Sequence, residues 1–241
     1  MTEPLSILFE DEHCLVVFKP SDVSTQAPLP SELTLENAVR HYLNPADPWS
    51  VYLGTVHRLD RPVSGVMLWA KTPKAARRLA AQFASRQAHK EYWAIVEGTP
   101  GTDAGLWDDW LLFDRSTGVG RAQVCSRQAP RARQAVTRFQ RSEAVRLPPG
   151  CCWLKLWPET GRTHQIRVQA AFRNLPIRGD RTYGGSAMFQ VGIALHARAL
   201  TVNHPILRQP MTFVAPLPEG WQAQGIELDA TGPEEPDRPL R

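Results

Sequence analysis

The sequence has 241 residues, of which 42% are hydrophobic and 22% are charged, as is usual for one folded domain of this size. No apolar run approaches the roughly 20 residues of a membrane helix. The net charge of +4 is uneven, because residues 224–241 carry five acidic and two basic side chains, which leaves +7 on residues 1–223. A basic body of this kind suits a polyanionic partner.

The N-terminus and the cysteines indicate the compartment. Residues 1–6 have neither the basic flank nor the apolar stretch of an export signal, which predicts a cytoplasmic protein. The four cysteines form no C-x-x-C pair, and Cys151 and Cys152 are adjacent, so that on a strand they would point to opposite faces. We therefore expect reduced thiols, with no zinc site and no disulfide framework.

Hydrophobic patterning predicts both strands and helices in the first hundred residues. The second helix has the clearest start, because Thr72 can cap its N-terminus and Pro73 suits its first position. The first helix is expected to end before Asn44 and Pro45. The predicted strands are residues 7–9, 14–18, 65–70 and 92–96, and the predicted helices are residues 35–42 and 73–87.

The remaining chain is predicted to consist mainly of strands. One helix is expected at residues 165–173, with Thr163 as its cap, and residues 224–241 are expected to form a disordered acidic tail after a single domain of residues 1–223. Strands outnumber helices and do not alternate with them regularly. The predicted fold class is therefore α+β, a mainly antiparallel mixed sheet flanked by helices. The strands of this part are residues 135–139, 151–157, 193–202 and 211–214.

Three polar segments stand out between apolar stretches. Residues 57–65 (His-Arg-Leu-Asp-Arg-Pro-Val-Ser-Gly) place Asp60 between two arginines, just before a buried strand. Residues 161–167 (Gly-Arg-Thr-His-Gln-Ile-Arg) put several hydrogen-bond donors at the start of a helix, which is a natural anion site. Lys90 and Tyr92 begin another strand. Taken singly, the segments are better explained as an ordinary turn, a capped polar loop and a half-buried packing residue.

In combination and in this order, the segments resemble the RluA family of pseudouridine synthases. The resemblance covers roughly residues 7–218. Val63 stands where that family often has threonine, and Gln169 where it commonly has histidine. The matching segments are residues 7–11 with 19–21, residues 57–60 with 64–65 and 70–71, Lys90 and Tyr92 with residues 96–98, residues 161–168, residues 179–180 with 183–185, and residues 195–197.

The resemblance implies a pseudouridine synthase catalytic fold and an isomerase that converts uridine in ribosomal or transfer RNA to pseudouridine. It implies no cofactor and no metal, and we expect a monomer that needs no membrane. Asp60 would be the essential carboxylate, acting either as a nucleophile on the sugar or as a base. Arg167 would pair with Asp60, and Tyr92 would stack on the uracil.

The resemblance also implies a set of substrate contacts. Arg58 would fill the space that the flipped uridine leaves, and Ile166 would supply an apolar floor for the ring. Further contacts are expected from His57, Arg162 and His164. Apart from the resemblance, five basic residues are candidate contacts to the RNA backbone, although a solvated charged helix face explains them equally well: Lys71, Arg77, Arg78, Arg86 and Lys90.

The alternative is a catalytically inactive RNA-binding protein with the same fold. The presence of Asp60, Tyr92 and Arg167 disfavours it, because a protein that had lost the activity would be expected to lose at least one of them. A third interpretation, a basic structural domain, leaves the three polar segments unexplained. If the chain is an enzyme, we expect Asp60, Tyr92 and Arg167 to converge on one cleft.

Overall fold

The computed structural model describes residues 5–26, 33–114, 120–185, 189 and 192–229. Two short 3-10 helices, η1 (Pro48–Ser50) and η2 (Arg181–Tyr183), lie among the longer elements. The helices are α1 (Leu35–Leu43), α2 (Pro73–Ala84), α3 (Gln165–Phe172) and α4 (Glu219–Ala223). The strands are β1 (Ile7–Glu10), β2 (Cys14–Lys19), β3 (Gly54–Thr55), β4 (Ser64–Ala70), β5 (His89–Glu97), β6 (Ala104–Asp114), β7 (Arg121–Cys125), β8 (Arg133–Ser142), β9 (Cys151–Pro158), β10 (Leu195–Asn203) and β11 (Pro210–Val214).

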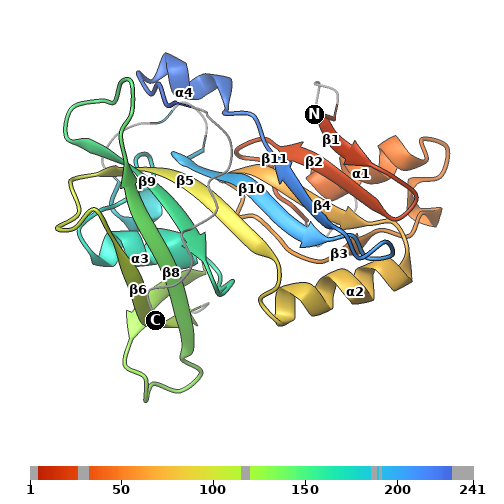
Figure 1. The fold of residues 1–241 in the computed structure, drawn as a ribbon, viewed down its shortest axis with the longest axis horizontal. Helices are drawn as coiled ribbons and strands as arrows, with labels where there is room; N and C mark the ends of the chain where they lie inside the picture. The colour runs from red at the N-terminus through yellow and green to blue at the C-terminus, as the bar shows by residue number, and fades with distance from the viewer. Residues whose placement is uncertain (1–4, 27–32, 115–119, 186–188, 190–191, 230–241) are drawn as a thin grey trace.

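All these strands join one mixed sheet, which runs through the whole molecule (Figure 1). Its order is β1-β2-β4-β10-β5-β9-β8-β6-β7, with β3 beside β4 and β11 beside β10. The β4–β10 pair is parallel, and every other pair is antiparallel. Helices α1 and α2 lie at the β1–β4 end of the sheet, and α3 lies at the β6–β9 end. The predicted α+β class with a mainly antiparallel mixed sheet is confirmed.

The parallel contact between β4 and β10 depends on a glycine. Gly65 has φ +129°, and a Cβ atom at this position would lie 2.2 Å from the carbonyl oxygen of Ala197. A side chain here would therefore push the two strands apart. Because β4 directly follows the loop that carries Asp60, this close approach sets where that loop leaves the sheet.

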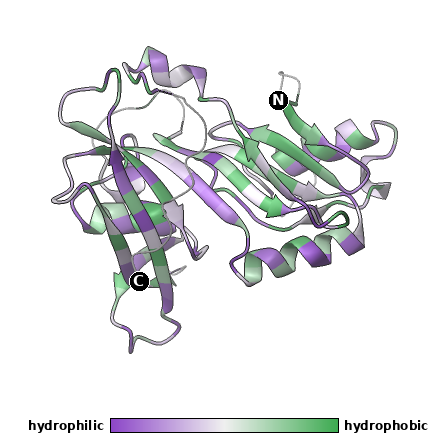
Figure 2. Cartoon of the chain, viewed as in Figure 1, coloured by the Kyte–Doolittle hydropathy of each residue, from purple (hydrophilic) through white to green (hydrophobic). Residues whose placement is uncertain are grey.

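Apolar side chains from the middle of the sheet form the core. Trp93 on β5 packs edge-on against Trp153 on β9, with ring centroids 4.7 Å apart, and both rings are almost fully buried. All seven residues of β4 are buried, as its continuous apolar sequence predicts. Hydrophobic and hydrophilic residues alternate along α2, which packs one face on the sheet (Figure 2). The predicted cap of this helix is present, because the Thr72 hydroxyl accepts the N–H of Ala75 at 3.2 Å.

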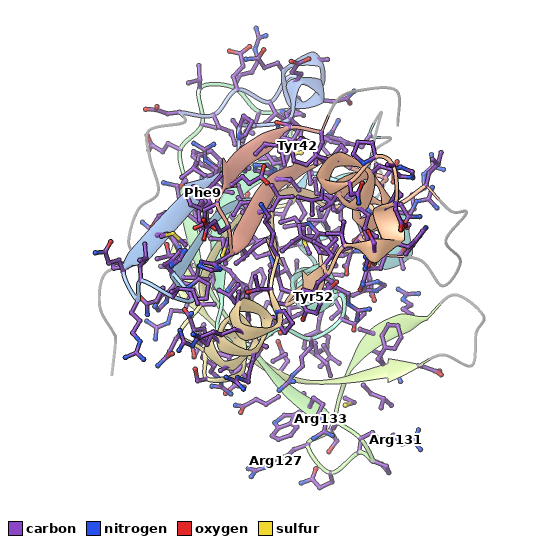
Figure 3. The ribbon with its side chains drawn as sticks, turned by 90° about the vertical axis from the view of Figure 1, so that its right-hand side faces the viewer. Phe9, Tyr42, Tyr52, Arg127, Arg131 and Arg133 are labelled. Atoms are coloured by element: carbon purple, nitrogen blue, oxygen red, sulfur yellow. The ribbon has the colours of Figure 1, made fainter. Side chains whose placement is uncertain are left out.

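Strands β6, β7 and β8 form an extension that we call the arm. It projects from the rest of the molecule, and Arg127, Arg131 and Arg133 lie around its far end (Figure 3). Patterning predicted only β8, because two adjacent aspartates interrupt the apolar alternation of β6. One of them, Asp109, is nevertheless buried, and its partners come from α3, far along the chain.

The structure corrects the expected start of α3 and the expected tail. The N-cap residue of α3 is His164, in the left-handed region with φ +56°, and not Thr163. The ordered chain continues past the predicted boundary at residue 223, because Ile226 is buried in the core and Glu227 pairs with Arg146 through backbone hydrogen bonds. Residues 230–241 of the expected tail lie outside the described residues.

The described chain also bears on the thiols and on membrane spans. The four cysteines are free, with Cys14 and Cys152 buried and the other two half-buried, which agrees with the expected reduced thiols. Within the described ranges, no helix has the length and apolar character that a bilayer crossing requires.

Candidate active site

One cavity of about 990 Å³ lies where the three polar segments meet. This volume is at the upper end of the range typical of small-molecule sites. The loop before β4, the start of β5 and the loop before α3 supply most of its wall. All eight side chains predicted as catalytic or substrate-binding line it: His57, Arg58, Asp60, Tyr92, Arg162, His164, Ile166 and Arg167.

The carboxylate of Asp60 is held through one of its two oxygens. Nη1 of Arg167 donates to Oδ2 of Asp60 at 3.2 Å, which brings the loop before β4 against α3. Nε2 of His164 lies 3.8 Å from the same oxygen. Within the described part of the chain, Oδ1 of Asp60 makes no hydrogen bond. The ion pair therefore orients the carboxylate and leaves one oxygen without a partner among the described residues.

Arg167 is itself fixed by a second carboxylate, which the sequence reasoning did not assign to the site. Its Nε and Nη2 donate to the two oxygens of Asp180 at 2.7 and 2.9 Å, a bidentate pair in which Asp180 is 1% exposed. Burial alone would lower the pKa of Arg167. The hydrogen bonds and charges of Asp180 and Asp60 outweigh that effect and raise its pKa, so the guanidinium stays charged.

Asp180 was noticed in the sequence only as part of the closing segments of the resemblance. The Gly179-Asp180 pair could have marked Asp180 as a candidate site residue, but the sequence does not indicate that Arg167 is its partner. The structure therefore revises the expected arrangement. Arg167 is anchored mainly by Asp180 and reaches Asp60 with its remaining nitrogen, so the three groups form one network.

His164 occupies the corner between α3 and the cavity. Its left-handed backbone is uncommon for a residue other than glycine, although histidine is among the residues that adopt it more often. Nδ1 lies 2.8 Å from the hydroxyl of Tyr183. Burial lowers the pKa of His164, which keeps the imidazole neutral at pH 7 although the nearby charge of Asp60 acts in the opposite direction.

Tyr92 and Ile166 form the less polar part of the wall. Tyr92 lies on β5, where it pairs with Ala197 of β10 and Leu156 of β9, so its backbone is fixed on both sides. Burial, together with the charge of Asp60, raises the pKa of Tyr92, and its side chain is therefore a neutral phenol. Ile166 is buried in the core cluster while it also borders the cavity.

His57 and Arg58 are neighbours with different surroundings. Nε2 of His57 accepts the backbone N–H of Leu68 at 2.9 Å, and its ring stacks on Phe83 with centroids 4.9 Å apart. Burial lowers the pKa of His57 to about 3, so the ring is neutral and holds the loop to β4. Arg58, in contrast, is exposed and makes no hydrogen bond or ion pair within the described residues.

Arg162 lies on the opposite side of the cavity and also contacts the arm. Its Nε donates to the carbonyl oxygen of Gln134 on β8 at 3.0 Å, and its backbone N–H donates to Oε1 of Gln165 at 3.0 Å. The loop before α3 is thus attached to the first residues of β8. This hydrogen bond connects the arm directly to the cavity wall.

The five candidate backbone contacts do not form one group. Lys71 is engaged by Glu10 at 2.6 Å, and Arg78 donates to the carbonyl oxygen of Pro205 at 2.7 Å, so both stabilise the fold. Arg86 and Lys90 line the cavity, and Nζ of Lys90 donates to a carbonyl oxygen of the opposite wall at 3.1 Å. Arg77 is exposed on α2, outside the cavity lining.

Lys19, a buried lysine at the end of β2, holds the loop that carries Asp60 in place. The sequence pattern gave no reason to assign it to the site. Nζ of Lys19 donates to the carbonyl oxygens of Pro20, Val23 and Arg61 at 2.9, 2.7 and 3.1 Å, and the residue is fully buried. Burial lowers the pKa of Lys19 to about 7, against the opposing charge of Asp60. Its three acceptors match the three protons of an ammonium group.

One group of side chains in the described residues has the composition of a metal site. Ligand atoms of Asp11, Cys14 and His204 lie within 4.8 Å of one another. Oδ1 of Asp11 accepts two backbone N–H groups and its Oδ2 lies 2.7 Å from Nε2 of His204, whose Nδ1 accepts two further N–H groups. The polar atoms are thus already paired within the protein, and the cluster serves to join β2 to the turn after β10.

Comparison with known proteins agrees with the geometry. The RNA pseudouridylate synthase family matches residues 13–172. The ribosomal large subunit pseudouridine synthase D of Xylella fastidiosa is 35% identical, over 90% of this chain and 67% of that protein. The tRNA pseudouridine synthase C of Pectobacterium carotovorum is 32% identical, over 90% of this chain and 60% of that protein. The solved structure of human RNA pseudouridylate synthase domain containing 1 superposes with a TM-score of 0.75 at 25% identity, over 93% and 89% of the two chains.

Proposed function

Because the chain belongs to the RNA pseudouridylate synthase family and is of the RluA type, we propose that it isomerises specific uridines of ribosomal or transfer RNA in the cavity around Asp60. The observation that carries this proposal is the orientation of one carboxylate. Arg167 holds Oδ2 of Asp60, and Oδ1 has no partner among the described residues. A carboxylate held in this way is suited to react with a sugar.

In the proposed reaction, the N-glycosidic bond of uridine breaks, the uracil turns, and a C–C bond forms to the same sugar. Asp60 begins the reaction, either as a nucleophile at the sugar carbon or as the base that removes a sugar proton. Arg167 keeps the carboxylate ionised and aimed, and Asp180 keeps Arg167 in its plane. Tyr92 contacts the uracil as a neutral phenol, and Ile166 forms the floor beneath the ring.

RNA binding is proposed to use the positive charge around the cavity. The lining includes several basic side chains but only two carboxylates, Asp60 and Glu159. Arg58, which has no hydrogen-bond or ion-pair partner among the described residues, enters the space that the flipped uridine leaves, because a guanidinium plane can stack on bases. Arg162 and His164 contact the nucleotide from the opposite wall, whereas His57 acts by holding the loop of Asp60 in place.

We extend the proposal to the protein as a whole. An isomerisation changes no redox state and needs no group donor, so the chain is proposed to work without cofactor or metal, as a monomer in the cytoplasm. The catalytic domain is proposed to run at least to residue 229, since Ile226 packs into its core.

Replacing Asp60 by asparagine tests the proposal directly. Asp60→Asn keeps the size of the side chain and removes its charge, nucleophilicity and basicity, so pseudouridine formation should be lost while RNA affinity stays nearly unchanged. Pseudouridine is mapped in total RNA from cells without this gene, after incubation with wild-type or variant protein, and the modified RNA identifies the ribosomal or transfer substrate.

The matched control is Asp47→Asn, because Asp47 is exposed and lies outside the cavity lining. This variant should modify RNA at the wild-type rate. Substantial activity in a clean Asp60→Asn preparation would contradict the assignment of Asp60. Wild-type protein that binds RNA and forms no pseudouridine would favour an RNA-binding protein instead.

A further inference from the structure

The two ring nitrogens of His164 face different groups. Nδ1 lies 2.8 Å from the hydroxyl oxygen of Tyr183, and Nε2 lies 3.8 Å from Oδ2 of Asp60. Tyr183 has no role in the proposed reaction, although this residue of η2 is buried, with 5% of its surface exposed. A neutral histidine donates a hydrogen bond from one ring nitrogen and accepts one at the other. The direction of the bond to Tyr183 therefore decides whether the nitrogen that faces Asp60 is a donor or an acceptor.

The direction of this bond follows from counting donors. The hydroxyl oxygen of Tyr183 accepts the backbone N–H of Ala122 at 2.8 Å, and a backbone N–H can only donate. The hydroxyl has one proton of its own, and its other hydrogen-bond partner in the described residues is Nδ1 of His164. Satisfying that proton requires Nδ1 to accept. The single ring proton of neutral His164 is then carried by Nε2.

Two cations next to the Tyr183 ring favour this direction. The guanidinium carbon of Arg121 lies 4.9 Å from the ring centroid, and that of Arg167 lies 5.1 Å from it. Positive charge beside a phenol stabilises the electron density that remains when the O–H proton is shared, which strengthens the hydroxyl as a donor. Burial still raises the pKa of Tyr183, so the residue stays a neutral phenol. Its hydroxyl is therefore placed to donate a hydrogen bond to Nδ1 of His164.

The groups around His164 keep its ring neutral. Burial favours the neutral imidazole, and the charge of Arg167 acts in the same direction, whereas Asp60 and Asp180 favour the protonated form. The pKa of His164 is lowered on balance. Its left-handed backbone aims the ring at both partners at once, which is a conformation that surrounding contacts must maintain.

We propose that Tyr183 is a positioning residue that holds His164 in its Nε2–H tautomer, as a hydrogen-bond donor to Oδ2 of Asp60. The separation of 3.8 Å is longer than a hydrogen bond, and such contacts in a site without substrate commonly shorten when substrate binds. His164 and Arg167 then bind the same oxygen, which leaves Oδ1 of Asp60 for the reaction. This inference rests on the proposed function, because it takes Asp60 as the reacting group.

Nitrogen-15 NMR of histidine-labelled protein tests the tautomer without RNA, so its failure is distinguishable from failure of the proposed function. The signals of His164 are identified by their loss in His164→Asn. Wild-type protein should show the Nε2–H tautomer. Tyr183→Phe should show a share of the Nδ1–H tautomer and raise the pKa of His164 by about half to one pH unit, the effect of losing one neutral hydrogen bond.

Two results of this measurement would overturn the inference. One is an Nδ1–H tautomer of His164 in wild-type protein, for which His164→Asn serves only to assign the signals. The other is a Tyr183→Phe protein whose His164 has the wild-type tautomer and pKa. Both concern a spectroscopic property that a purely structural role of Tyr183 would leave unchanged.

Single-turnover rates at saturating RNA test whether Tyr183 acts through His164. Tyr183→Phe should slow the reaction about 3- to 10-fold, and Tyr42→Phe, which removes a surface hydroxyl bonded to Glu10, should have no effect. His164→Gln can place an amide N–H where the histidine Nε2–H lay, but it has no ring nitrogen in the place of Nδ1. In a His164→Gln background, Tyr183→Phe should therefore change the rate less than about 2-fold. An equal loss in both backgrounds would refute the inference.

Discussion

Helix α3 and its C-cap residue present two arginines to carboxylates, one at the cavity and one on the arm. Arg167 binds both oxygens of Asp180 at 2.7 and 2.9 Å, and Arg173 binds both oxygens of Asp109 at 2.9 and 3.1 Å. Both pairs are bidentate, but Arg167 donates from Nε and Nη2, whereas Arg173 donates from Nη1 and Nη2. They differ in exposure, because the Arg167 side chain is 5% exposed and that of Arg173 is 26% exposed.

The two sites differ more in the further hydrogen bonds that each arginine and each carboxylate makes. Arg167 has a nitrogen left for Asp60, whose Oδ1 remains unpaired in the described residues. Asp109 instead accepts a further N–H from Gln169 at 2.7 Å, so its oxygens are all engaged within the protein. The same kind of ion pair therefore anchors a reacting group at the cavity and completes a structural network at the arm. Unused hydrogen-bonding capacity distinguishes the functional pair.

Removing each arginine should separate these roles most strongly. Arg167→Ala leaves Asp180 as a buried charge without its partner and should lower the free energy of unfolding by about 3–5 kcal/mol, with loss of activity. Arg173→Ala should cost about 1–3 kcal/mol, because Asp109 keeps the N–H of Gln169. Urea unfolding gives the stabilities, and single-turnover assays at a temperature where both variants are folded give the rates.

Arg167→Lys keeps a positive charge and loses the planar fork, so it should recover part of the stability and little of the rate. The comparison would fail if folded Arg173→Ala were as inactive as folded Arg167→Ala.

Replacing the carboxylates Asp180 and Asp109 tests the same difference between the two ion pairs, with a smaller expected change in rate and stability. Asp180→Asn weakens the charge-assisted hold on Arg167 and should lower the single-turnover rate about 10- to 100-fold, corresponding to 1.5–3 kcal/mol. Asp109→Asn should change the rate less than about 3-fold while it lowers stability. Asp109 itself lies outside the cavity lining, and its hydrogen bonds reach Gln165 of the lining only through two further side chains. Equal rates in the two variants would show that orientation of Arg167 does not limit the reaction.

The arm should contribute to RNA affinity and not to the rate. Arg133 lies near the far end of the arm and is exposed (Figure 3). If it contacts a phosphate, Arg133→Gln should weaken binding a few-fold and reduce the slope of log affinity against log salt by about 0.7–0.9. Lys74→Gln, at the start of α2 and outside the cavity lining, is the matched control. An unchanged salt slope in Arg133→Gln would exclude that contact.

The sequence predicted most of the strands and helices and the eight catalytic or substrate-binding residues that line the cavity, but not the roles of Asp180 and Tyr183. Local patterning predicted a buried strand at residues 65–70, observed as Ser64–Ala70, and the capped start of α2, because those signals lie within a few neighbouring residues. The arm strands β6 and β7 were missed for the opposite reason. Asp109 is buried on β6 because Gln169 and Arg173 of α3 satisfy it, and no local pattern contains that information.

Gln169 illustrates the same limit at a position noted as unusual in the sequence. Its amide accepts from the Thr137 hydroxyl at 2.7 Å and donates to Asp109, so the side chain joins α3 to two strands of the arm. The departure from the family pattern could be read in the sequence, and its consequence could not.

The order and chemistry of the three polar segments already established the family, the fold class and the residues that surround the cavity. Tertiary structure decided how those residues are paired: Asp180 rather than Asp60 as the main anchor of Arg167, and Tyr183 as the partner of His164. The physical reason is the short range of hydrogen bonds and ion pairs. A residue type and its neighbours define what a side chain can donate or accept, but only the folded backbone brings two distant groups within the 3 Å or so over which the bond forms.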